Sequence, residues 1–372
     1  MSAVSDEAVR AALHGVLDPE LRRPIDELGM LRSVTVDGGR VTVGVLLTIA
    51  GCPLRDTIEK DVAAALRGVP GVEEAVVELD VMTPEQRREL KERLRPGRGI
   101  PFSRPDSLTK VFAVASGKGG VGKSSVTVNL ACELAARGLR VGIVDADVHG
   151  FSVPGLLGVT GRPTQVDDMI LPPIAHGVKV ISIGMFVEGN QPVAWRGPML
   201  HRALEQFLGD VYFGDLDVLF LDLPPGTGDV AISVSQLLPN AELLVVTTPQ
   251  AAAAEVAERA GTVSAQTGQK VVGVIENMSG LTLPDGTVMD VFGSGGGQRV
   301  AERLTAALGA SVGLLGQVPL DVGLRAGGDA GTPIVLGDPG SPAAVALRAV
   351  ADRLAAVPRN LAGRRLGVTP AV

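Results

Sequence analysis

Cysteine and aromatic residues are scarce in this chain of 372 residues. Its only cysteines, Cys52 and Cys132, lie far apart and form no C-x-x-C pair, which excludes a disulfide framework and a four-cysteine metal site within one chain. Because Phe, Trp and Tyr make up only 3% of the residues, the cores must be built from Val, Leu, Ile and Ala. A chain of this length is expected to form two or three domains, each with a core of its own.

Long apolar runs and clusters of basic residues are also missing. No stretch of about 18 apolar residues occurs, because Asp, Arg, Pro or Gly interrupts every candidate, so we expect no membrane-spanning helix and no membrane partner. Residues 1–7 are acidic and unlike a secretory signal, which predicts a cytoplasmic protein. The net charge is −7 and no block of Lys or Arg stands out, so we expect no nucleic-acid partner.

Lysine is rare as well, yet two of the seven lysines lie in one glycine-rich stretch, GKGGVGKSS. This stretch has the spacing G-x-x-x-x-G-K-[ST] of a phosphate-binding loop, in which backbone N–H groups close around phosphates. An apolar segment before it (111–115) predicts a buried strand, and the apolar spacing after it (127–137) predicts a helix. A nucleoside triphosphate is therefore the expected ligand. Its expected contacts in the loop are Gly117, Lys118, Gly119, Gly120, Val121, Gly122, Lys123, Ser124 and Ser125.

The two lysines of this loop have different expected roles. Lys123 should bind the β- and γ-phosphates, and the hydroxyl of Ser124 should bind Mg²⁺. Lys118 comes one residue after the first glycine, where its side chain would either face solvent or reach the phosphates of a partner subunit, as an arginine finger does. We favour the second alternative, because lysine is otherwise so rare.

The order of predicted elements indicates an α/β chain, with a doubly wound, mostly parallel sheet preceded by a small α/β domain. Residues 1–95 are expected to form the small domain, 96–110 a Pro/Gly linker without regular structure, and 111–372 the P-loop domain. In the large domain short apolar strands alternate with helical segments, which is typical of a parallel sheet with helices on both faces. Its strands are expected at 111–116, 140–145, 178–183, 218–222, 243–247, 271–275 and 311–317. In the small domain we expect helices at 6–17, 56–67 and 84–95, and strands at 31–36, 40–48 and 72–79.

Ligands of such sheets bind at the carboxyl ends of the strands, and three acidic residues are expected there. Asp145 and Asp147 follow one strand, and their alternative interpretation is an ordinary solvated turn. We expect one carboxylate to support Mg²⁺ or the loop lysine and the other, Asp147, to polarise the attacking water. Asp222 ends another apolar strand and should support Mg²⁺, while Gly226 in the Pro-Pro-Gly segment after it should bring its backbone N–H to a γ-phosphate.

Two later segments follow strands in the same way. Asn277 is a candidate to offer its amide to a purine edge, and Pro319 and Asp321 follow the next strand at the equivalent place. Each segment is explained equally well as a turn that ends a strand. The glycine-rich run 293–297 is expected to be a mobile loop that leads into a helix at 299–308.

The loop GKGGVGKSS, together with DADVHGFSVP, FLDLPPGTGD and VIENMS, resembles the MinD/ParA-like P-loop ATPases, and specifically the Mrp/ApbC iron–sulfur cluster carrier branch. The likeness covers nearly the whole chain. Within residues 1–95 the stretches DPE, DELGM and TIAGCPL look like a small domain that also occurs in iron–sulfur assembly factors. The resemblance implies an ATP hydrolase that forms a homodimer and delivers clusters to apoprotein clients or works with other assembly proteins. By position it makes Lys118 the lysine that enters the partner's site, Asp147 the water-orienting acid, Asp222 the Mg²⁺-linked acid, and Asn277, Pro319 and Asp321 the adenine contacts.

One departure from the family concerns the metal. Many members carry a C-P-x-C pair shortly after the E-N-M-S segment, where two subunits hold a bridging [4Fe–4S] cluster. The corresponding residues here, 279–286, read SGLTLPDG and contain no cysteine, so the cluster site in its usual form is absent. Cys52 is then the candidate ligand, together with the partner subunit's Cys52 or external thiols; a purely structural role is the alternative. Cys132 is expected in a core. The four histidines show no ligand spacing, and only His149 lies near the active-site loop.

Two other functions stay open. A cluster-free ATPase that acts as a scaffold or regulator of iron–sulfur assembly would explain the missing cysteines. A positioning ATPase that acts on membrane or DNA would need an amphipathic basic helix or a basic stripe. The tail 358–366 has three arginines but two helix breakers, and so gives this second alternative little support.

Overall fold

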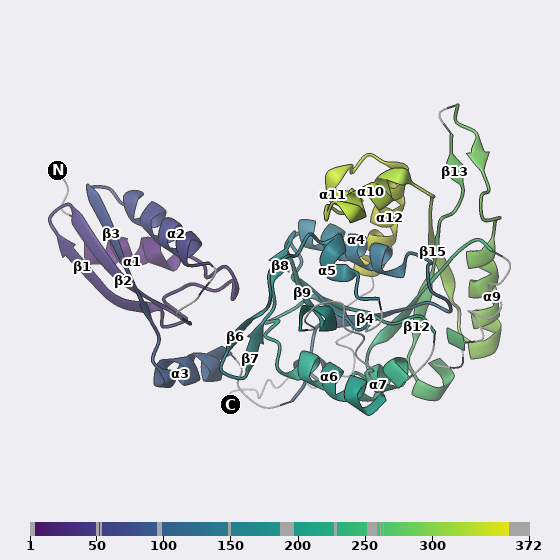
Figure 1. The fold of residues 1–372 in the computed structure, drawn as a ribbon, viewed down its shortest axis with the longest axis horizontal. Coiled ribbons are helices and arrows are strands. Elements are labelled where there is room, and N and C mark those ends of the chain that lie inside the picture. Colours follow the sequence, from purple (N-terminus) through teal and green to yellow (C-terminus); the bar gives the residue numbers. More distant parts are fainter. Residues whose placement is uncertain are drawn as a thin grey trace, which may run out of the picture. The chain divides into compact units, whose positions relative to one another are not determined.

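The computed structural model describes residues 4–49, 52, 54–94, 99–147, 150–186, 197–226, 229–250, 259–260, 262, 264–283 and 285–356. The chain divides into two compact units (Figure 1). The first consists of Met1–Gly99, Pro163–Pro172 and Asp210–Gly214, and the second of Ile100–Arg162, Pro173–Gly209 and Asp215–Val372.

The first unit is built on a three-stranded sheet. Strand β1 (Leu31–Asp37) pairs antiparallel with β2 (Arg40–Leu47), and β2 pairs parallel with β3 (Glu74–Val81). Helix α1 (Asp6–His14) buries Val9 and Leu13 in one core with β2. Helix α2 (Arg55–Arg67) adds Ile58, Val62 and Leu66 to the same core. Helix α3 (Pro84–Leu94) follows β3. Every element predicted for this part is present, with the largest shift at the end of α1, which stops at His14 instead of Leu17.

A short hairpin from the middle of the chain also belongs to the first unit. Strands β6 (Thr164–Val166) and β7 (Met169–Leu171) pair antiparallel, and the buried Val166, Met169 and Leu171 join the core of this unit. At the hairpin turn, Asp167 forms an ion pair with Arg87 of α3 at 3.3 Å, and Asp168 forms one with Lys91. The sequence did not predict this hairpin, because three-residue strands are too short for a detectable alternation.

The second unit contains an eight-stranded sheet in the order β15-β12-β11-β4-β10-β5-β9-β8. All neighbouring pairs are parallel except β8 with β9 at the edge. The strands are β4 (Lys110–Ala115), β5 (Val141–Asp145), β8 (Ile174–Ala175), β9 (Val178–Ser182), β10 (Val218–Asp222), β11 (Glu242–Thr247), β12 (Val271–Asn277) and β15 (Gly313–Val318). The doubly wound, mostly parallel sheet predicted from the alternating elements is therefore confirmed, and all seven predicted strands are present.

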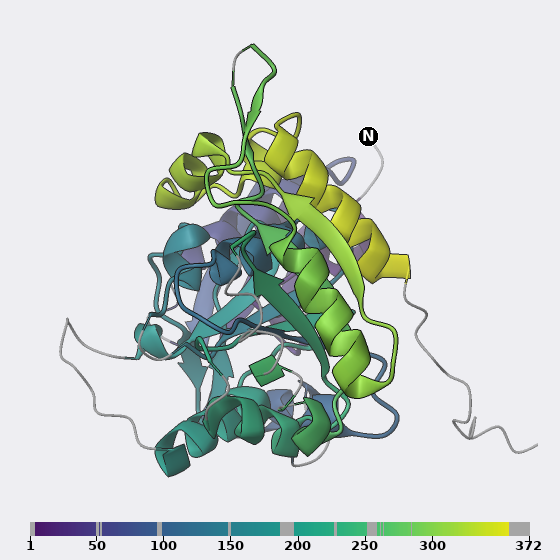
Figure 2. The same ribbon diagram turned by 90° about the vertical axis from the view of Figure 1, so that its right-hand side faces the viewer.

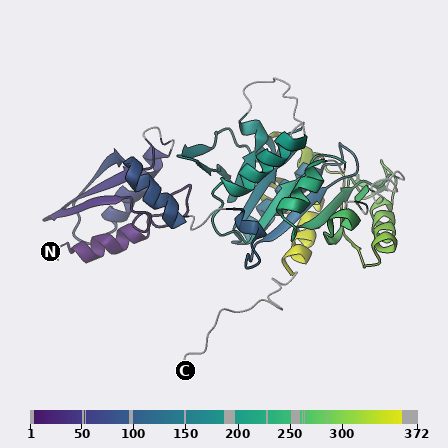
Figure 3. The same cartoon turned by 90° about the horizontal axis from the view of Figure 1, so that it is seen from below.

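Helices cover both faces of this sheet. Helices α4 (Lys123–Ala136) and α12 (Pro342–Ala356) pack on one face, and their apolar side chains form one core with Phe112 and Phe220 of the central strands. Helices α6 (Gly197–Gly209) and α7 (Asp229–Leu237) lie on the opposite face, which is turned toward the viewer in Figure 3. Helix α9 (Gly296–Leu308) packs beside β12 and β15 (Figure 2). The shorter helices are α5 (Val153–Leu156), α10 (Val322–Asp329) and α11 (Ile334–Gly337), with a 3₁₀ turn η2 (Ile183–Met185).

Two segments expected to be irregular contain helical residues, although 293–295 of the glycine run form the expected loop before a helix. The linker contains a 3₁₀ turn, η1 (Pro101–Ser103), because Pro101 presets the first helical φ and the side chain of Phe102 is buried. The glycine run 293–297 is where α9 begins, and Gly296 and Gly297 are buried. A Cβ on Gly296 would lie 2.4 Å from the Thr248 carbonyl oxygen, and one on Gly297 would lie 2.7 Å from the Cβ of Glu276. The glycines are therefore needed for close packing of the helix start on the sheet.

A second hairpin, β13 (Leu281–Thr282) with β14 (Val288–Met289), projects from the second unit (Figures 1 and 2). In the described part of the chain, each helix is too short or too polar to span a membrane.

Candidate functional site

The predicted functional residues meet at one edge of the large sheet. Strands β4, β10 and β5 are neighbours, and their carboxyl ends lead to the glycine loop, to Asp222 and to Asp145. Asp222 and Asp145 stand in register on adjacent parallel strands. The parallel order therefore brings together residues that are about 100 positions apart in the sequence, as the rule for doubly wound sheets predicts.

The glycine loop turns directly into helix α4. Gly120 and Gly122 have φ values of +75° and +77°, and Gly122 is the N-cap of the helix. A Cβ on Gly122 would lie 2.2 Å from the Nδ2 atom of Asn277, so a side chain there is excluded by space as well as by backbone conformation. The loop residues Gly119–Ser125 line a cavity of about 280 Å³, which Asp147, Gly150, Ser152 and Leu156 close from the side of β5. This cavity ends on the N-terminus of a helix, where backbone N–H groups and the helix dipole favour an anion.

Lys123 and Asp222 form the buried charge pair of the site. The Lys123 amine is 2.7 Å from Asp222 Oδ2, and these side chains are 6% and 0% exposed. Among the described residues the amine has no hydrogen-bond partner beyond this ion pair, so its donors are available for phosphate oxygens. Ser124 donates its hydroxyl to Asp222 Oδ2, and the Thr127 hydroxyl lies 2.9 Å from Oδ1. Thr127 was not predicted, although it lies one helical turn after Lys123 and therefore on the same side of the helix.

Asp145 lies beside Asp222 on the adjacent parallel strand, and both side chains are buried. It is fully buried and accepts hydrogen bonds from the Ser182 hydroxyl at 3.0 Å and from the backbone N–H of Asp147 at 3.2 Å. Burial raises the pKa of Asp145 to about 7, and the nearby Asp222 carboxylate adds to this rise. Asp145 is therefore the residue of this site whose carboxyl titrates near neutral pH.

Asp147 lies at the wall of the cavity rather than behind it. It is partly exposed, and its Oδ1 accepts the backbone N–H of Gly150 at 3.1 Å. A carboxylate that faces the cavity from the strand next to Asp222 is available to a water molecule beside a bound phosphate. His149, which the sequence marked near this loop, is outside the described residues.

Asn277 packs on the phosphate loop. Its Nδ2 donates to the Val121 carbonyl at 2.9 Å, and the residue is only 2% exposed. Its Oδ1 has no hydrogen-bond partner among the described residues. The neighbouring Met278 has φ +61°, an uncommon backbone conformation for a residue other than glycine. A buried amide oxygen without a partner beside a phosphate site is suited to a donor group on a bound ligand.

The other predicted contacts lie less directly at the cavity. Gly226 has φ +93°, and its N–H is engaged with the Ser116 carbonyl at 2.8 Å. Pro319 follows β15, next to the end of β12. Asp321 caps helix α10 by accepting the N–H of Gly323 at 2.7 Å. The cap accounts for this carboxylate locally, and adenine contact by Pro319 and Asp321 stays a prediction.

The Lys118 side chain has a different partner from Lys123. Its amine donates to the side-chain carbonyl of Gln250, which follows β11, and Arg259 donates to the Gly117 carbonyl at 2.9 Å. Gln250 and Arg259 were not identified from the sequence, although the end of β11 reaches the same edge of the sheet.

The two cysteines have different surroundings. Cys132 is fully buried in α4, as predicted, and burial raises its pKa to about 12. Cys52 is half-buried, and burial raises its pKa, with a further rise from Glu20 and Asp18. Within the described residues, no three His, Cys, Asp or Glu side chains are grouped to hold a metal ion.

Known protein families match both parts of the chain. The model of the iron-sulfur cluster assembly protein family matches residues 6–79, and that of ParA, the NUBPL iron-transfer P-loop NTPases, matches residues 107–355. The chain belongs to the NUBPL iron-transfer P-loop NTPase family. This membership confirms the resemblance inferred from the motifs GKGGVGKSS, FLDLPPGTGD and VIENMS.

Individual relatives of this family extend the match along the chain. A protein named iron-sulfur cluster carrier protein from Mycobacterium tuberculosis (strain ATCC 25618 / H37Rv) is 64% identical over 367 residues, 98% of this chain and 96% of the relative. One of the same name from Bacillus subtilis (strain 168) is 41% identical over 320 residues, 85% of this chain and 88% of the relative. A solved nucleotide-binding protein from Archaeoglobus fulgidus in complex with ADP is 36% identical, with a TM-score of 0.51 over 60% of this chain and 86% of that chain.

Proposed function

We propose that this chain is an ATP-hydrolysing carrier of iron–sulfur clusters that works in the cytoplasm as a homodimer. The observation that carries the nucleotide part is the buried Lys123–Asp222 pair at the base of the glycine-loop cavity. The family match and the names of the relatives support the carrier part.

The residues around Asp222 fit a magnesium ion. A carboxylate and the hydroxyl of Ser124, already in hydrogen-bond contact, are the hard oxygen donors that Mg²⁺ prefers. We propose that Ser124 and Asp222 hold Mg²⁺, with Asp145 supporting Asp222 from the adjacent strand. When bound, the ion would neutralise charge on the β- and γ-phosphates. The Lys123 amine, released from Asp222, would contact the same phosphates.

The reaction proposed is attack of water on the γ-phosphate, which gives ADP and phosphate. Asp147 is placed to orient and polarise this water, because its carboxylate borders the cavity. Gly226 would donate its N–H to the γ-phosphate, which requires it to leave the Ser116 carbonyl. Lys118 of the partner subunit would stabilise the charge that develops on the phosphate.

The side chain of Asn277 gives a physical reason to expect adenine as the base of the nucleotide. Its Nδ2 is held by the Val121 carbonyl, so its Oδ1 is presented as an acceptor. The 6-amino group of adenine is a donor and matches this oxygen, whereas guanine has an acceptor at position 6 and would have to present its N1–H or 2-amino group instead. We therefore propose ATP rather than GTP as the substrate.

The cargo part of the proposal depends on Cys52. The hairpin that follows Asn277 contains no cysteine, and Cys132 is enclosed in the core of α4. A cluster would thus be held by Cys52 together with the partner subunit's Cys52 or with external thiols. The alternative is a cluster-free ATPase scaffold, which the missing hairpin cysteines and the raised pKa of Cys52 favour.

Anaerobic reconstitution with iron and sulfide tests the cargo proposal. Wild type, Cys52→Ser and the control Cys132→Ala are compared by absorbance and by iron content per chain. The carrier proposal expects iron in wild type and in Cys132→Ala, and none above background in Cys52→Ser. If wild type itself binds no iron, the scaffold alternative replaces the carrier.

A further inference from the structure

The two lysines of the phosphate loop are held in different ways. Lys123 is buried beside Asp222 at the base of the cavity. The Lys118 amine instead donates to Gln250, and Lys118 is not among the residues that line the cavity. Lys118 is thus held by a residue of its own chain beside the cavity, whereas its proposed role is at the partner subunit's phosphates.

The backbone on the N-terminal side of Lys118 is also held from outside the loop. Arg259 donates to the carbonyl of the buried Gly117 at 2.9 Å. The Ser116 carbonyl accepts the N–H of Gly226 at 2.8 Å. Three consecutive residues, 116–118, are thus each bonded to a different residue that follows β10 or β11.

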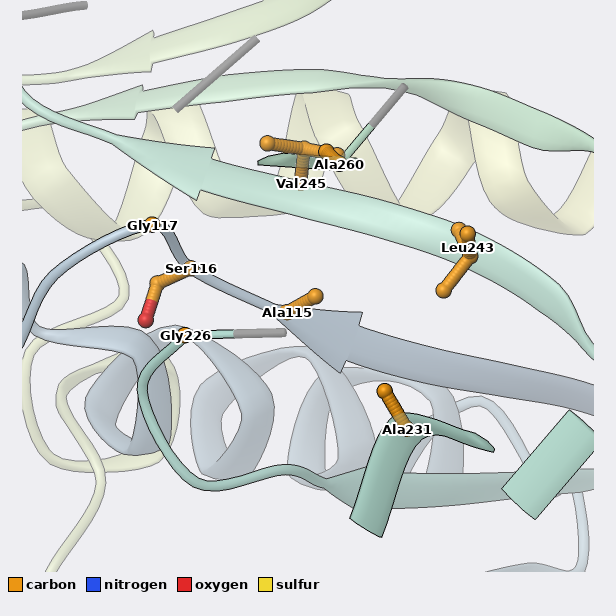
Figure 4. A pocket seen from close by; sticks show the side chains of 8 residues that line it. All are labelled: Ala115, Ser116, Gly117, Gly226, Ala231, Leu243, Val245 and Ala260. Carbon is orange, nitrogen blue, oxygen red and sulfur yellow. The ribbon is translucent and has the colours of Figure 1, made fainter. Parts of the chain in front are cut away.

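A small apolar pocket of about 10 Å³ adjoins Ser116, Gly117 and Gly226 (Figure 4). It is lined by Ser116 and Gly117 of the loop, by Gly226 and Ala231 after β10, by Ala260 next to Arg259, and by Ala115, Leu243 and Val245 of the strands. Side chains of these residues are mostly small and leave the space between the segments incompletely filled.

The chemistry of Gln250 suits a releasable contact. Its side chain is neutral, so it holds the Lys118 amine by a hydrogen bond without an opposite charge. The Lys118 ammonium is positively charged, and a phosphate oxygen adds an opposite charge that the Gln250 carbonyl lacks, so a bound triphosphate would compete well for the same amine. A glutamate at this position would hold the lysine by an ion pair, and an alanine would not hold it.

We propose that Gln250 is a positioning residue that holds Lys118 back from the partner subunit's phosphates and releases it when a triphosphate is bound there. Arg259 fixes the backbone from which the lysine extends. The consequence for hydrolysis rests on the proposed function, whereas the contact itself can be tested without it.

Pulse labelling of lysines with acetic anhydride tests the contact. Wild type, Gln250→Ala and the control Gln298→Ala, a surface glutamine bonded to Glu302, are labelled without nucleotide and analysed by peptide mass spectrometry. The exposed Lys60 serves as the internal reference. Loss of one hydrogen bond should raise Lys118 labelling about fivefold in Gln250→Ala only. Equal Lys118 labelling in all three proteins would overturn the proposal.

A second set of measurements asks whether the contact limits hydrolysis. With a non-hydrolysable ATP analogue and Mg²⁺, wild type and Gln250→Ala should label Lys118 equally, because phosphates then hold the amine in both. Gln250→Glu should lower kcat about fivefold without changing ADP affinity, whereas Gln250→Ala should keep or raise kcat. A drop in kcat for Gln250→Ala that matches Lys118→Ala would contradict a holding role. If wild type hydrolyses no ATP, the proposed function fails, and the labelling still decides on Gln250.

Discussion

The nucleotide site and the β13–β14 hairpin both follow strands of the same sheet, but they are built very differently. At the nucleotide site Lys123, Asp145 and Asp222 are buried and contact one another or their neighbours. The hairpin consists of two-residue strands, and its Val288 and Met289 are 61% and 50% exposed. The first region has the residues that its chemistry needs, whereas the second lacks the cysteines found there in many family members.

This contrast separates the two halves of the proposed function. At the nucleotide site Lys123 and Asp222 form a buried ion pair that the hydroxyls of Ser124 and Thr127 also contact, so changes there should be costly. The hairpin has little packing to lose and no cluster ligand, so changes there should be tolerated. The contrast would be wrong if both regions responded alike to substitution.

The largest effect is expected at Lys123. Lys123→Ala removes the phosphate contact and leaves Asp222 buried without its counter-charge, so ADP affinity should fall at least about 100-fold. Calorimetric titration with ADP measures this, and circular dichroism checks that the variant is folded. Lys270→Ala, at a lysine that is 71% exposed, is the control. ADP affinity within a few-fold of wild type in Lys123→Ala would show that the buried pair is not the nucleotide site.

A smaller but specific effect is expected at Asp147. Asp147→Asn keeps an acceptor for the Gly150 N–H but loses the negative charge that polarises water. We expect kcat for ATP to fall about 100-fold with KM nearly unchanged. Asp290→Asn, at an exposed position after the hairpin, should leave both unchanged. A rise in KM with constant kcat in Asp147→Asn would assign this residue to binding instead.

The interior acid predicts a pH dependence of stability. Because burial raises the pKa of Asp145 to about 7, the folded chain keeps a proton that the unfolded chain releases above its ordinary pKa of 3.8. Asp145 therefore lowers the free energy of unfolding as pH rises toward 7, and the loss levels off above 7. Between about pH 5.5 and pH 8 the loss should be about 2 kcal/mol relative to Asp145→Asn, measured by urea unfolding. Parallel pH profiles of the two proteins would contradict the raised pKa.

The smallest effect is expected in the hairpin. Val288→Ser changes an exposed side chain, so the free energy of unfolding should move by no more than about 0.5 kcal/mol, and ATP hydrolysis should not change. Thermal unfolding and steady-state hydrolysis measure both. A large loss of hydrolysis in this variant would mean that the hairpin takes part in the nucleotide reaction.

The sequence predicted the elements that have a clear local pattern and missed those that do not. The large sheet and its phosphate loop follow from local patterns, because buried parallel strands are continuous apolar runs and the loop needs its glycines at fixed spacing. The short strands β6, β7, β13 and β14 carry no such pattern, since two or three residues show no periodicity. The start of α9 at Gly296 was missed because its glycines serve tertiary packing on Glu276 and Thr248 rather than a turn.

Some site residues follow from local motifs, whereas other contacts depend on the tertiary arrangement of the strands. Lys123, Ser124 and Asp222 were predicted together, because one motif and one strand end place each of them, and the structure brings them into contact. The contacts of Lys118 with Gln250 and of Gly117 with Arg259 depend on which strand ends lie side by side, which no local pattern encodes. The Asp321 carboxylate also caps α10, a role visible only once that helix is known, and its adenine contact stays a prediction.

The central claim is that nucleotide chemistry and cluster binding reside in separate parts of this chain. The most direct test measures iron content and ATP hydrolysis on the same anaerobically reconstituted Cys52→Ser protein. The account predicts that iron falls to background while ATP hydrolysis stays at the wild-type rate. Retention of iron together with a loss of ATP hydrolysis in this variant would contradict it.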